Sequence, residues 1–293
     1  MAAASDVNVW IQNDWLQACS IHGVGEFNED VLVINEKAGI FGVIDGATAI
    51  SNPRSSSGES GGYVASRILA SAAEHAASNM SLKELVLEAN LELRQRIVSE
   101  GIDIKQKEAL WAAAFVLFKV NETTIEFAQA GDCMLYARYI NNEVRTITRD
   151  QVRPFDRITL QKRVEARRSG LSTHEEIMEY VKPYINLNRN KTNTLEGYSV
   201  FNGEIELENF IETGTINRAG LINIYALTDG LLYPDNDEAE NNVHGMLDRI
   251  DQLGLQNYAL ELIAEEEQDL ECVKNVRHKI SDDKTGIVLD LSK

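Results

Sequence analysis

Cysteine is scarce in this chain, and none of its three cysteines lies at the CxxC spacing of a redox or zinc motif. Isolated cysteines do not suit a disulfide framework or a cysteine-ligated zinc site, and they favour a reducing, cytoplasmic environment. The three are Cys19, Cys133 and Cys272.

Positive charge is also in short supply. The chain has 28 Lys and Arg residues against 46 Asp and Glu, which gives a formal net charge of −18 and a pI near 4.7. An acidic excess of this size repels phosphate backbones and anionic lipids. We therefore expect neither a nucleic acid nor a membrane as a partner.

Long hydrophobic runs are missing as well. The longest, residues 109–118, is too short to span a bilayer, and the first residues lack the basic region and apolar core of a signal peptide. No Gly-x4-Gly-Lys-Ser/Thr loop supports nucleotide hydrolysis of the P-loop kind. With 293 residues, 44% of them hydrophobic, the chain can bury a large core. We expect a single domain over residues 1–293, cytoplasmic and monomeric.

What the chain does have is a set of short acidic motifs, most of which follow an apolar, strand-like run. Carboxylates at the ends of buried strands can converge on one sheet edge, where hard divalent cations make so much negative charge tolerable. Because no His or Cys cluster accompanies them, the pattern predicts Mn²⁺ or Mg²⁺, with two ions able to share one carboxylate. The motifs are Asn28-Glu29-Asp30, Asp45-Gly46, Gly131-Asp132, Asp229-Gly230 and Asp282-Asp283.

The first two motifs can be placed relative to each other. Residues 31–34 and 40–44 are apolar runs separated by a turn-like break. Folded as an antiparallel hairpin, they return Asp45 to the level of Asp30, and Gly46 lets the backbone carbonyl approach a ligand.

Helices and strands then follow in blocks, which favours α+β layers over alternating βαβ units. A helix is expected from residue 64, and Ser81 with Glu84 forms a capping box for a second. The Ser- and Gly-rich residues 51–62 are expected to form a mobile loop. Further predictions are an antiparallel meander of four strands over 111–148, strands at 222–227 and 286–291, and helices near 238–253 and 257–273.

Residues 150–196 look like an insertion, because the hydrophobic pattern weakens there and Lys and Arg become frequent. Two interpretations stay open. The segment is either a solvated, amphipathic helix pair or a lid that helps to recruit an anionic substrate.

In order along residues 23–291, the motifs NED, VIDGA, AGDC, LTDGL and SDDKT resemble those of the metal-dependent type 2C (PPM) serine/threonine protein phosphatases of the bacterial type. A lone Asp-Gly is usually just a turn, but five motifs in order form a specific signal. The resemblance implies a four-layer αββα sandwich with two central antiparallel sheets. It also implies that a water bridging two Mn²⁺ or Mg²⁺ ions directly attacks phosphoserine or phosphothreonine in a phosphorylated protein substrate.

The resemblance assigns roles to single residues. Asp45 would bridge both ions and Gly46 would offer its carbonyl to one. Asp229 and Asp282 would complete the other, and Glu29 would act through a metal-bound water. Asp132 matches the position of a third, weaker ion in some bacterial members, and the neighbouring Asp30 and Asp283 belong to the same acidic set.

Two departures from the family pattern stand out. Gly25 lies where many members carry a phosphate-binding arginine, a loss of about 1.5–3 kcal/mol for a charged hydrogen bond. Arg54, Arg157 and Arg189 are candidates to replace it. The usual histidine after Asp45-Gly46 is also missing, which leaves His22 as a speculative substitute.

Two other functions stay open. The missing arginine and histidine allow a catalytically weak or inactive relative that binds a phosphorylated partner as a regulatory module. Gly58-Glu59-Ser60-Gly61-Gly62 matches the G-x-S-x-G pattern of serine hydrolases, with His278 as a partner. The polar, proline-containing residues 52–57 disfavour the strand that such a nucleophile needs.

Overall fold

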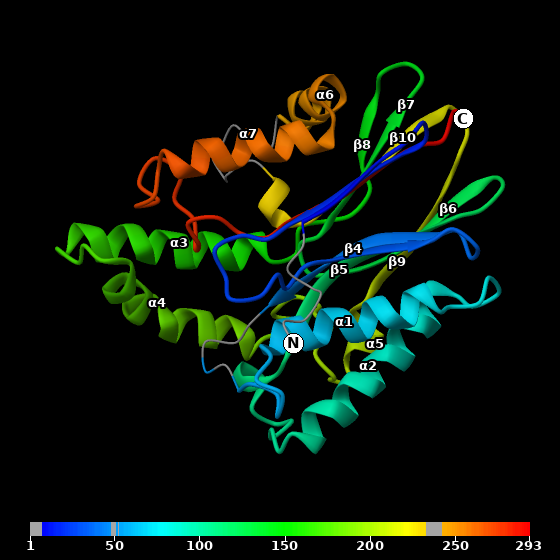
Figure 1. Ribbon diagram of the computed structural model, residues 1–293. Helices are drawn as coiled ribbons and strands as arrows, with labels where there is room; N and C mark the ends of the chain where they lie inside the picture. The colour runs from blue at the N-terminus through cyan, green and yellow to red at the C-terminus, as the bar shows by residue number, and fades with distance from the viewer. Residues whose placement is uncertain (1–7, 48–50, 52, 233–241) are drawn as a thin grey trace.

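The computed structural model describes residues 8–47, 51, 53–232 and 242–293. Two antiparallel sheets stack in the middle of the molecule, and helices cover both outer faces (Figure 1). One sheet has six strands in the order β1-β2-β11-β10-β7-β8, and the other has five in the order β3-β4-β5-β6-β9. The predicted α+β sandwich with two central antiparallel sheets is confirmed.

The strands of the six-stranded sheet are β1 (Val9–Gln12), β2 (Leu16–Ile21), β7 (Met134–Tyr139), β8 (Val144–Thr146), β10 (Leu221–Leu227) and β11 (Lys284–Asp290). Those of the five-stranded sheet are β3 (Val31–Asn35), β4 (Ile40–Ala47), β5 (Ala112–Val120), β6 (Thr124–Ala130) and β9 (Glu212–Asn217). The helices are α1 (Gly61–Glu74), α2 (Leu82–Ser99), α3 (Arg153–Arg168), α4 (His174–Arg189), α5 (Leu207–Phe210), α6 (Val243–Leu253) and α7 (Leu255–Glu267), with short 3-10 turns η1 (Lys107–Ala109) and η2 (Asp229–Leu231).

The core has three apolar layers, one between the sheets and one beneath each pair of covering helices. Strand β4 shows why residues 40–44 are apolar. Phe41 and Val43 face the other sheet, whereas Ile40 and Ile44 face α1 and α2. A strand buried on both faces needs apolar side chains at successive positions, since neighbouring side chains point to opposite faces.

Helix α2 starts at the predicted capping box. The Ser81 hydroxyl accepts from the backbone N–H of Glu84, whose carboxylate reaches back to the N–H of Ser81. This reciprocal pair satisfies two backbone donors that the first helical turn leaves open. Helices α1 and α2 thus cover the five-stranded sheet, and α6 and α7 cover the six-stranded one (Figure 1).

Residues 111–148 do not form one meander, which corrects the prediction. Strands β5 and β6 pair in one sheet and β7 and β8 in the other, and the chain crosses between the sheets at residues 131–133. Strands β1, β2 and β9 were not predicted. Residues 59–62 are also more ordered than a mobile loop, because Ser60 caps α1 and Gly61 and Gly62 are buried in its first turn.

The basic segment folds as a helix pair, α3 and α4, that extends from one end of the sandwich (Figure 1). A small apolar cluster of Ala166, Ile177 and Val181 holds the two helices together. None of the helices in the described part of the chain is long and apolar enough to cross a bilayer. All three cysteines are buried, and none forms a disulfide.

Candidate metal centre

The sheet register brings the acidic motifs together at one end of the sandwich. Val31 pairs with Ile44, so Asp30 and Asp45 lie beside each other at the open end of the β3–β4 hairpin, as predicted. On the other sheet, Leu227 pairs with Gly286, which places Asp229 after β10 near Asp282 before β11. Segments 260 residues apart in the chain thus meet, since Gly23 N–H donates to the Asp283 carboxylate.

A cavity of about 240 Å³ opens at this end. The predicted site residues that line it are Glu29, Asp45, Gly46, Asp132, Arg189, Asp229 and Asp282. Asp30, Asp283, Arg54 and Arg157 do not line it.

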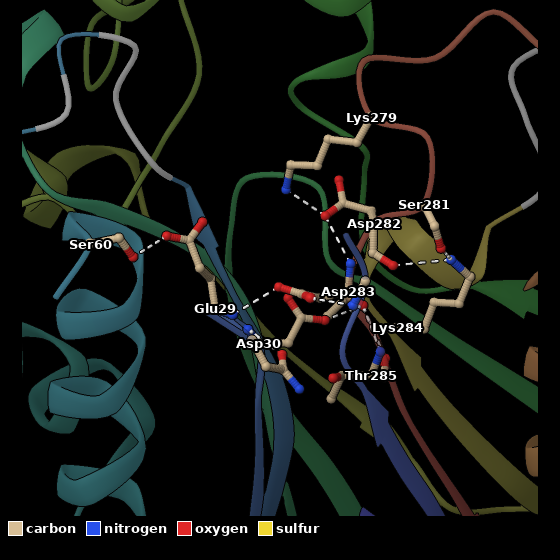
Figure 2. A network of polar contacts seen from close by, with 12 residues as sticks. Glu29, Asp30, Ser60, Lys279, Ser281, Asp282, Asp283, Lys284 and Thr285 are labelled. Carbon is tan, nitrogen blue, oxygen red and sulfur yellow. Dashed lines mark hydrogen bonds and ion pairs between the residues drawn. The ribbon is translucent and has the colours of Figure 1, made fainter. Parts of the chain in front are cut away.

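Asp283 and Asp30 connect the two sheets through hydrogen bonds. The Asp283 carboxylate accepts from the backbone N–H groups of Gly23 and Glu29, each at 2.8 Å (Figure 2). The Asp30 carboxylate accepts from the Thr228 hydroxyl at 2.9 Å. Both acids are at most 5% exposed, so they position the site from behind the cavity.

Glu29 lies at the junction of the cavity with α1. The Ser60 hydroxyl, at the N-cap of that helix, donates to its carboxylate (Figure 2). Arg67 of α1 donates to the backbone carbonyls of Glu29 and Asp30, each at 3.1 Å. Helix α1 therefore fixes both the side chain and the backbone of this motif.

Gly46 is required by a close approach of two backbones. A Cβ atom on Gly46 would lie 2.4 Å from the carbonyl oxygen of Gly62 and 2.8 Å from that of Glu29. A side chain at this position would push α1 away from β4. The glycine thus keeps the helix, Glu29 and Asp45 in contact.

The carboxylates disfavour one another's ionised form. Burial, followed by repulsion from Asp282, raises the pKa of Asp229 to about 6. Burial also raises the pKa of Asp45, with repulsion from Asp30 next in size, and it raises the pKa of Asp132 together with repulsion from Asp229. Buried acids in this state gain from any cation placed among them.

Besides Lys107, two cationic residues line the same cavity, Lys279 and Arg189. Lys279 places its ammonium nitrogen 2.5 Å from Oδ1 of Asp282 (Figure 2). Burial lowers the pKa of Lys279, but attraction by Asp282, Asp45 and Asp229 outweighs burial and raises it well above its usual range. Arg189, at the end of α4, also lines the cavity and donates to the Ala47 carbonyl at 3.2 Å.

The structure separates the three arginine candidates. Arg54 is bound on the surface to the Glu26 carboxylate and to the Gly58 carbonyl. Arg157 lines a second, larger cavity of about 920 Å³, which shares Asp229, Lys279 and Asp282 with the first. Only Arg189, among these three, lines the cavity that contains Asp45 and Gly46.

A loop network holds the segment after α4 in place. Lys107 bridges to the Glu204 carboxylate at 2.7 Å and donates to the Thr192 carbonyl at 2.6 Å. The same carboxylate accepts from the side chains of Asn193 and Asn202. Since these groups are mostly buried, the network fixes the wall from which Arg189 enters the cavity.

The donor set fits a hard divalent cation in kind. Several carboxylates and Gly46 line the cavity, and burial and mutual repulsion raise the pKa values of Asp45 and Asp229, so a cation among them would favour their ionised forms. Within the residues that the structure describes, however, no three His, Cys, Asp or Glu side chains stand close enough to hold one ion as they are. If a metal binds, Asp45, Asp229, Asp282 and the Gly46 carbonyl are the groups that would hold it.

The structure argues against a serine hydrolase. Ser60 is 4% exposed, and its hydroxyl is bonded to Glu29. No strand precedes it within residues 53–59. His278 lies against α3, where its Nε2 contacts the Thr159 hydroxyl at 3.1 Å.

The fold of this chain, two stacked antiparallel sheets with helices outside, is similar to that of solved bacterial serine/threonine phosphatases. No protein-family model and no curated protein matches the chain. Among solved structures, the catalytic domain of the serine/threonine phosphatase PstP, in complex with two manganese ions, aligns with a TM-score of 0.56 at 17% identity, over 94% of this chain and 96% of that one.

Two further structures give the same result. Stp1 from Staphylococcus aureus has a TM-score of 0.55 at 13% identity and covers 97% of both chains. PppA, a regulatory component of T6SS in Pseudomonas aeruginosa, has a TM-score of 0.52 at 14% identity over 94% of this chain and 98% of that one. At such identities the likeness shows the fold.

Sequence reasoning missed several residues of the cavity, chiefly Lys279, Tyr198 and Lys107. For Lys279 a signal was present, because a lysine three residues before Asp282 on a tight segment can reach its carboxylate. Tyr198 and Lys107 carry no comparable signal, since only the folded loops bring them to the cavity.

Proposed function

We propose that this chain is a metal-dependent phosphatase that hydrolyses phosphoserine and phosphothreonine in proteins. The observation that supports it best is the single cavity that gathers Glu29, Asp45, Asp229, Asp282 and Arg189 at the end of a phosphatase fold. These groups come from both sheets and from α4, so the fold itself assembles them.

The aspartates and the arginine have different parts in the proposed chemistry. Divalent ions, when bound, would supply positive charge to the phosphate oxygens and lower the pKa of water. Asp45, Asp229 and Asp282 would hold that charge. Arg189 would bind the phosphate through its forked guanidinium. It would replace the arginine that many type 2C phosphatases carry at the position of Gly25.

Leaving-group protonation needs another source, since no histidine is among the described residues that line the smaller cavity. His22 is not among them either; its backbone N–H donates to Asn8. We propose that water protonates the leaving oxygen.

The test is hydrolysis of p-nitrophenyl phosphate and of a phosphothreonine peptide with Mn²⁺, with Mg²⁺ and with EDTA. We expect turnover with metal, none with EDTA, and a loss of at least about 100-fold in Asp45→Asn, because that change removes a charge on which the cluster depends. Near wild-type turnover in this variant would show that the assignment is wrong. Asp14→Asn, on the surface loop before β2, is the matched control and should keep full activity.

A second candidate is a regulatory module that binds a phosphorylated partner without turnover. The specific observation in its favour is Lys279, which already neutralises Asp282. Tight, Arg189-dependent binding of a phosphothreonine peptide in the absence of any hydrolysis would favour this candidate.

A further inference from the structure

Lys279 lies where the two cavities meet and lines both of them. Its ammonium group points at Asp282, at a distance of 2.5 Å from Oδ1 (Figure 2). Asp45 and Asp229 also attract this ammonium group. A positive charge that belongs to the protein thus already interacts with three of the acids that would hold a metal ion.

The loop that carries Lys279 is fixed upstream. Arg277 forms an ion pair with Asp269 at 2.8 Å and donates through Nε to the Ile280 carbonyl at 2.9 Å. Asp269 in turn accepts from the backbone N–H groups of residues 273–275, which closes the turn after α7. The backbone on either side of Lys279 is therefore held against α7.

The loop is also fixed downstream. Lys284, whose side chain is 1% exposed, pairs with Glu266 of α7 at 2.8 Å and donates to the Asp282 carbonyl at 3.0 Å. Ser281 donates to the same glutamate at 2.6 Å. With both flanks anchored, the contact between Lys279 and Asp282 is set by the loop geometry.

An ammonium group and a divalent ion cannot both use the same carboxylate oxygen. Like charges a few ångström apart repel each other strongly in a partly buried site. The ammonium group is a compact point charge with three donors, so it satisfies Asp282 much as a cation would. The side chain of Lys279 is nevertheless 44% exposed, which leaves it room to swing into solvent.

We propose that the Lys279 ammonium group competes with a divalent cation for Asp282, so that an ion enters this part of the cluster only when Lys279 swings out. The inference rests on the proposed function, because it takes the acidic cluster as a metal site. It makes Lys279 a residue that sets metal affinity and so limits how much of the protein carries metal.

The test is titration of the purified, EDTA-treated and dialysed protein with Mn²⁺ alone in a calorimeter. We expect Lys279→Met, which keeps the length of the side chain and removes its charge, to bind Mn²⁺ at least about tenfold more tightly than the native protein. Lys279→Arg keeps the charge and should stay weak. Lys274→Met removes a charge from the same loop but outside both cavities, and it should match the native protein.

The outcomes separate this inference from the proposed function. Equal or weaker Mn²⁺ binding by Lys279→Met, alongside clear binding by the native protein, would overturn the competition and leave the phosphatase intact. Absence of Mn²⁺ binding by the native protein and all variants would overturn both. If Lys279→Met fails to fold, Lys279→Gln serves for the same measurement, with the same expected gain.

Discussion

At the scale of single residues, the side chain that would bind the substrate phosphate is Arg189. Arg189 is far in the sequence from the position whose role it would take, since Gly25 is 164 positions upstream. It reaches the cavity because α4 ends beside Ala47, at the end of β4. Because Arg189 belongs to the α3–α4 helix pair, this pair is part of the proposed active site. A lid that recruits an anionic substrate would need such a residue.

Arg189→Ala is expected to raise KM for a phosphothreonine peptide by about tenfold or more and to lower kcat less, because the lost contact is made to the bound phosphate. The measurement is steady-state hydrolysis with Mn²⁺. Arg54→Ala is the matched control: it removes an exposed ion pair with Glu26, so its KM should stay within about twofold. An unchanged KM in Arg189→Ala would remove this residue from the phosphate site.

At the scale of elements, the packing of α1 against the five-stranded sheet depends on a glycine, Gly61. A Cβ atom on Gly61 would lie 2.1 Å from Cδ1 of Trp111, which is fully buried and donates through Nε1 to the Pro53 carbonyl. The indole cannot yield without losing that bond. Helix α1 carries Ser60 and Arg67, so its position decides the position of Glu29.

Gly61→Ala should therefore lower the free energy of unfolding by about 1–3 kcal/mol, as overpacked cores do. The measurement is urea unfolding. Gly245→Ala in α6 is the control, because a Cβ there would meet only the end of the Asn242 side chain. Because alanine has a higher helix propensity than glycine, this change should leave the free energy of unfolding unchanged or raise it by up to about 1 kcal/mol. Equal changes in the free energy of unfolding for the two variants would mean that contact with Trp111 does not fix the position of α1.

How well the sequence predicted each element depended on how local its contacts are. The β3–β4 hairpin was predicted with Asp30 beside Asp45 because the two strands adjoin and a short turn fixes their register. The sequence predicts another hairpin at the β6–β7 connection, since residues 131–133 are as short as a hairpin loop, but the two strands belong to different sheets. Strands β2 and β11 pair although they come from opposite ends of the chain, and no local sequence pattern predicts this pairing.

The same contrast holds in the site. The acids were predicted from motifs at strand ends, whereas the choice of Arg189 over Arg54 depends on where α4 ends and on the ion pair that holds Arg54. Arg54 is nearer in sequence to Asp45, but Glu26 holds it at the surface. The sequence alone offered no way to rank the two.

At the scale of the whole molecule, charge is unevenly distributed. The chain is strongly acidic, with a net charge of −18, yet the α3–α4 pair is rich in Arg and Lys and stands at the end of the sandwich that holds the cavities. An anionic substrate repelled by most of the surface would meet its least repulsive approach there.

Stability of the whole protein should follow the protonation of the buried acids. The pKa of Asp229 is about 6 in the folded protein and 3.8 as the ordinary value. Between these values the folded state holds more protons than the unfolded state, so stability falls as pH rises through 6. The raised pKa values of Asp30, Asp45 and Asp132 act in the same direction. Asp269 and His278 act oppositely. The lowered pKa of Asp269 does so only at strongly acidic pH, whereas burial lowers the pKa of His278 to about 4, so this histidine opposes the four acids as pH rises towards its ordinary value of 6.5.

We therefore expect the EDTA-treated protein to have a lower Tm at about pH 7.5 than at about pH 5, a loss on the order of 1–3 kcal/mol from this cluster. Thermal unfolding followed by circular dichroism measures it. Mn²⁺ should restore the Tm mainly at the higher pH, because only ionised carboxylates attract the ion. Asp45→Asn should flatten the dependence, since it removes one acid and relieves its neighbours. A Tm that rises between these pH values without metal would show that the raised pKa values of the acids do not outweigh the lowered pKa of His278.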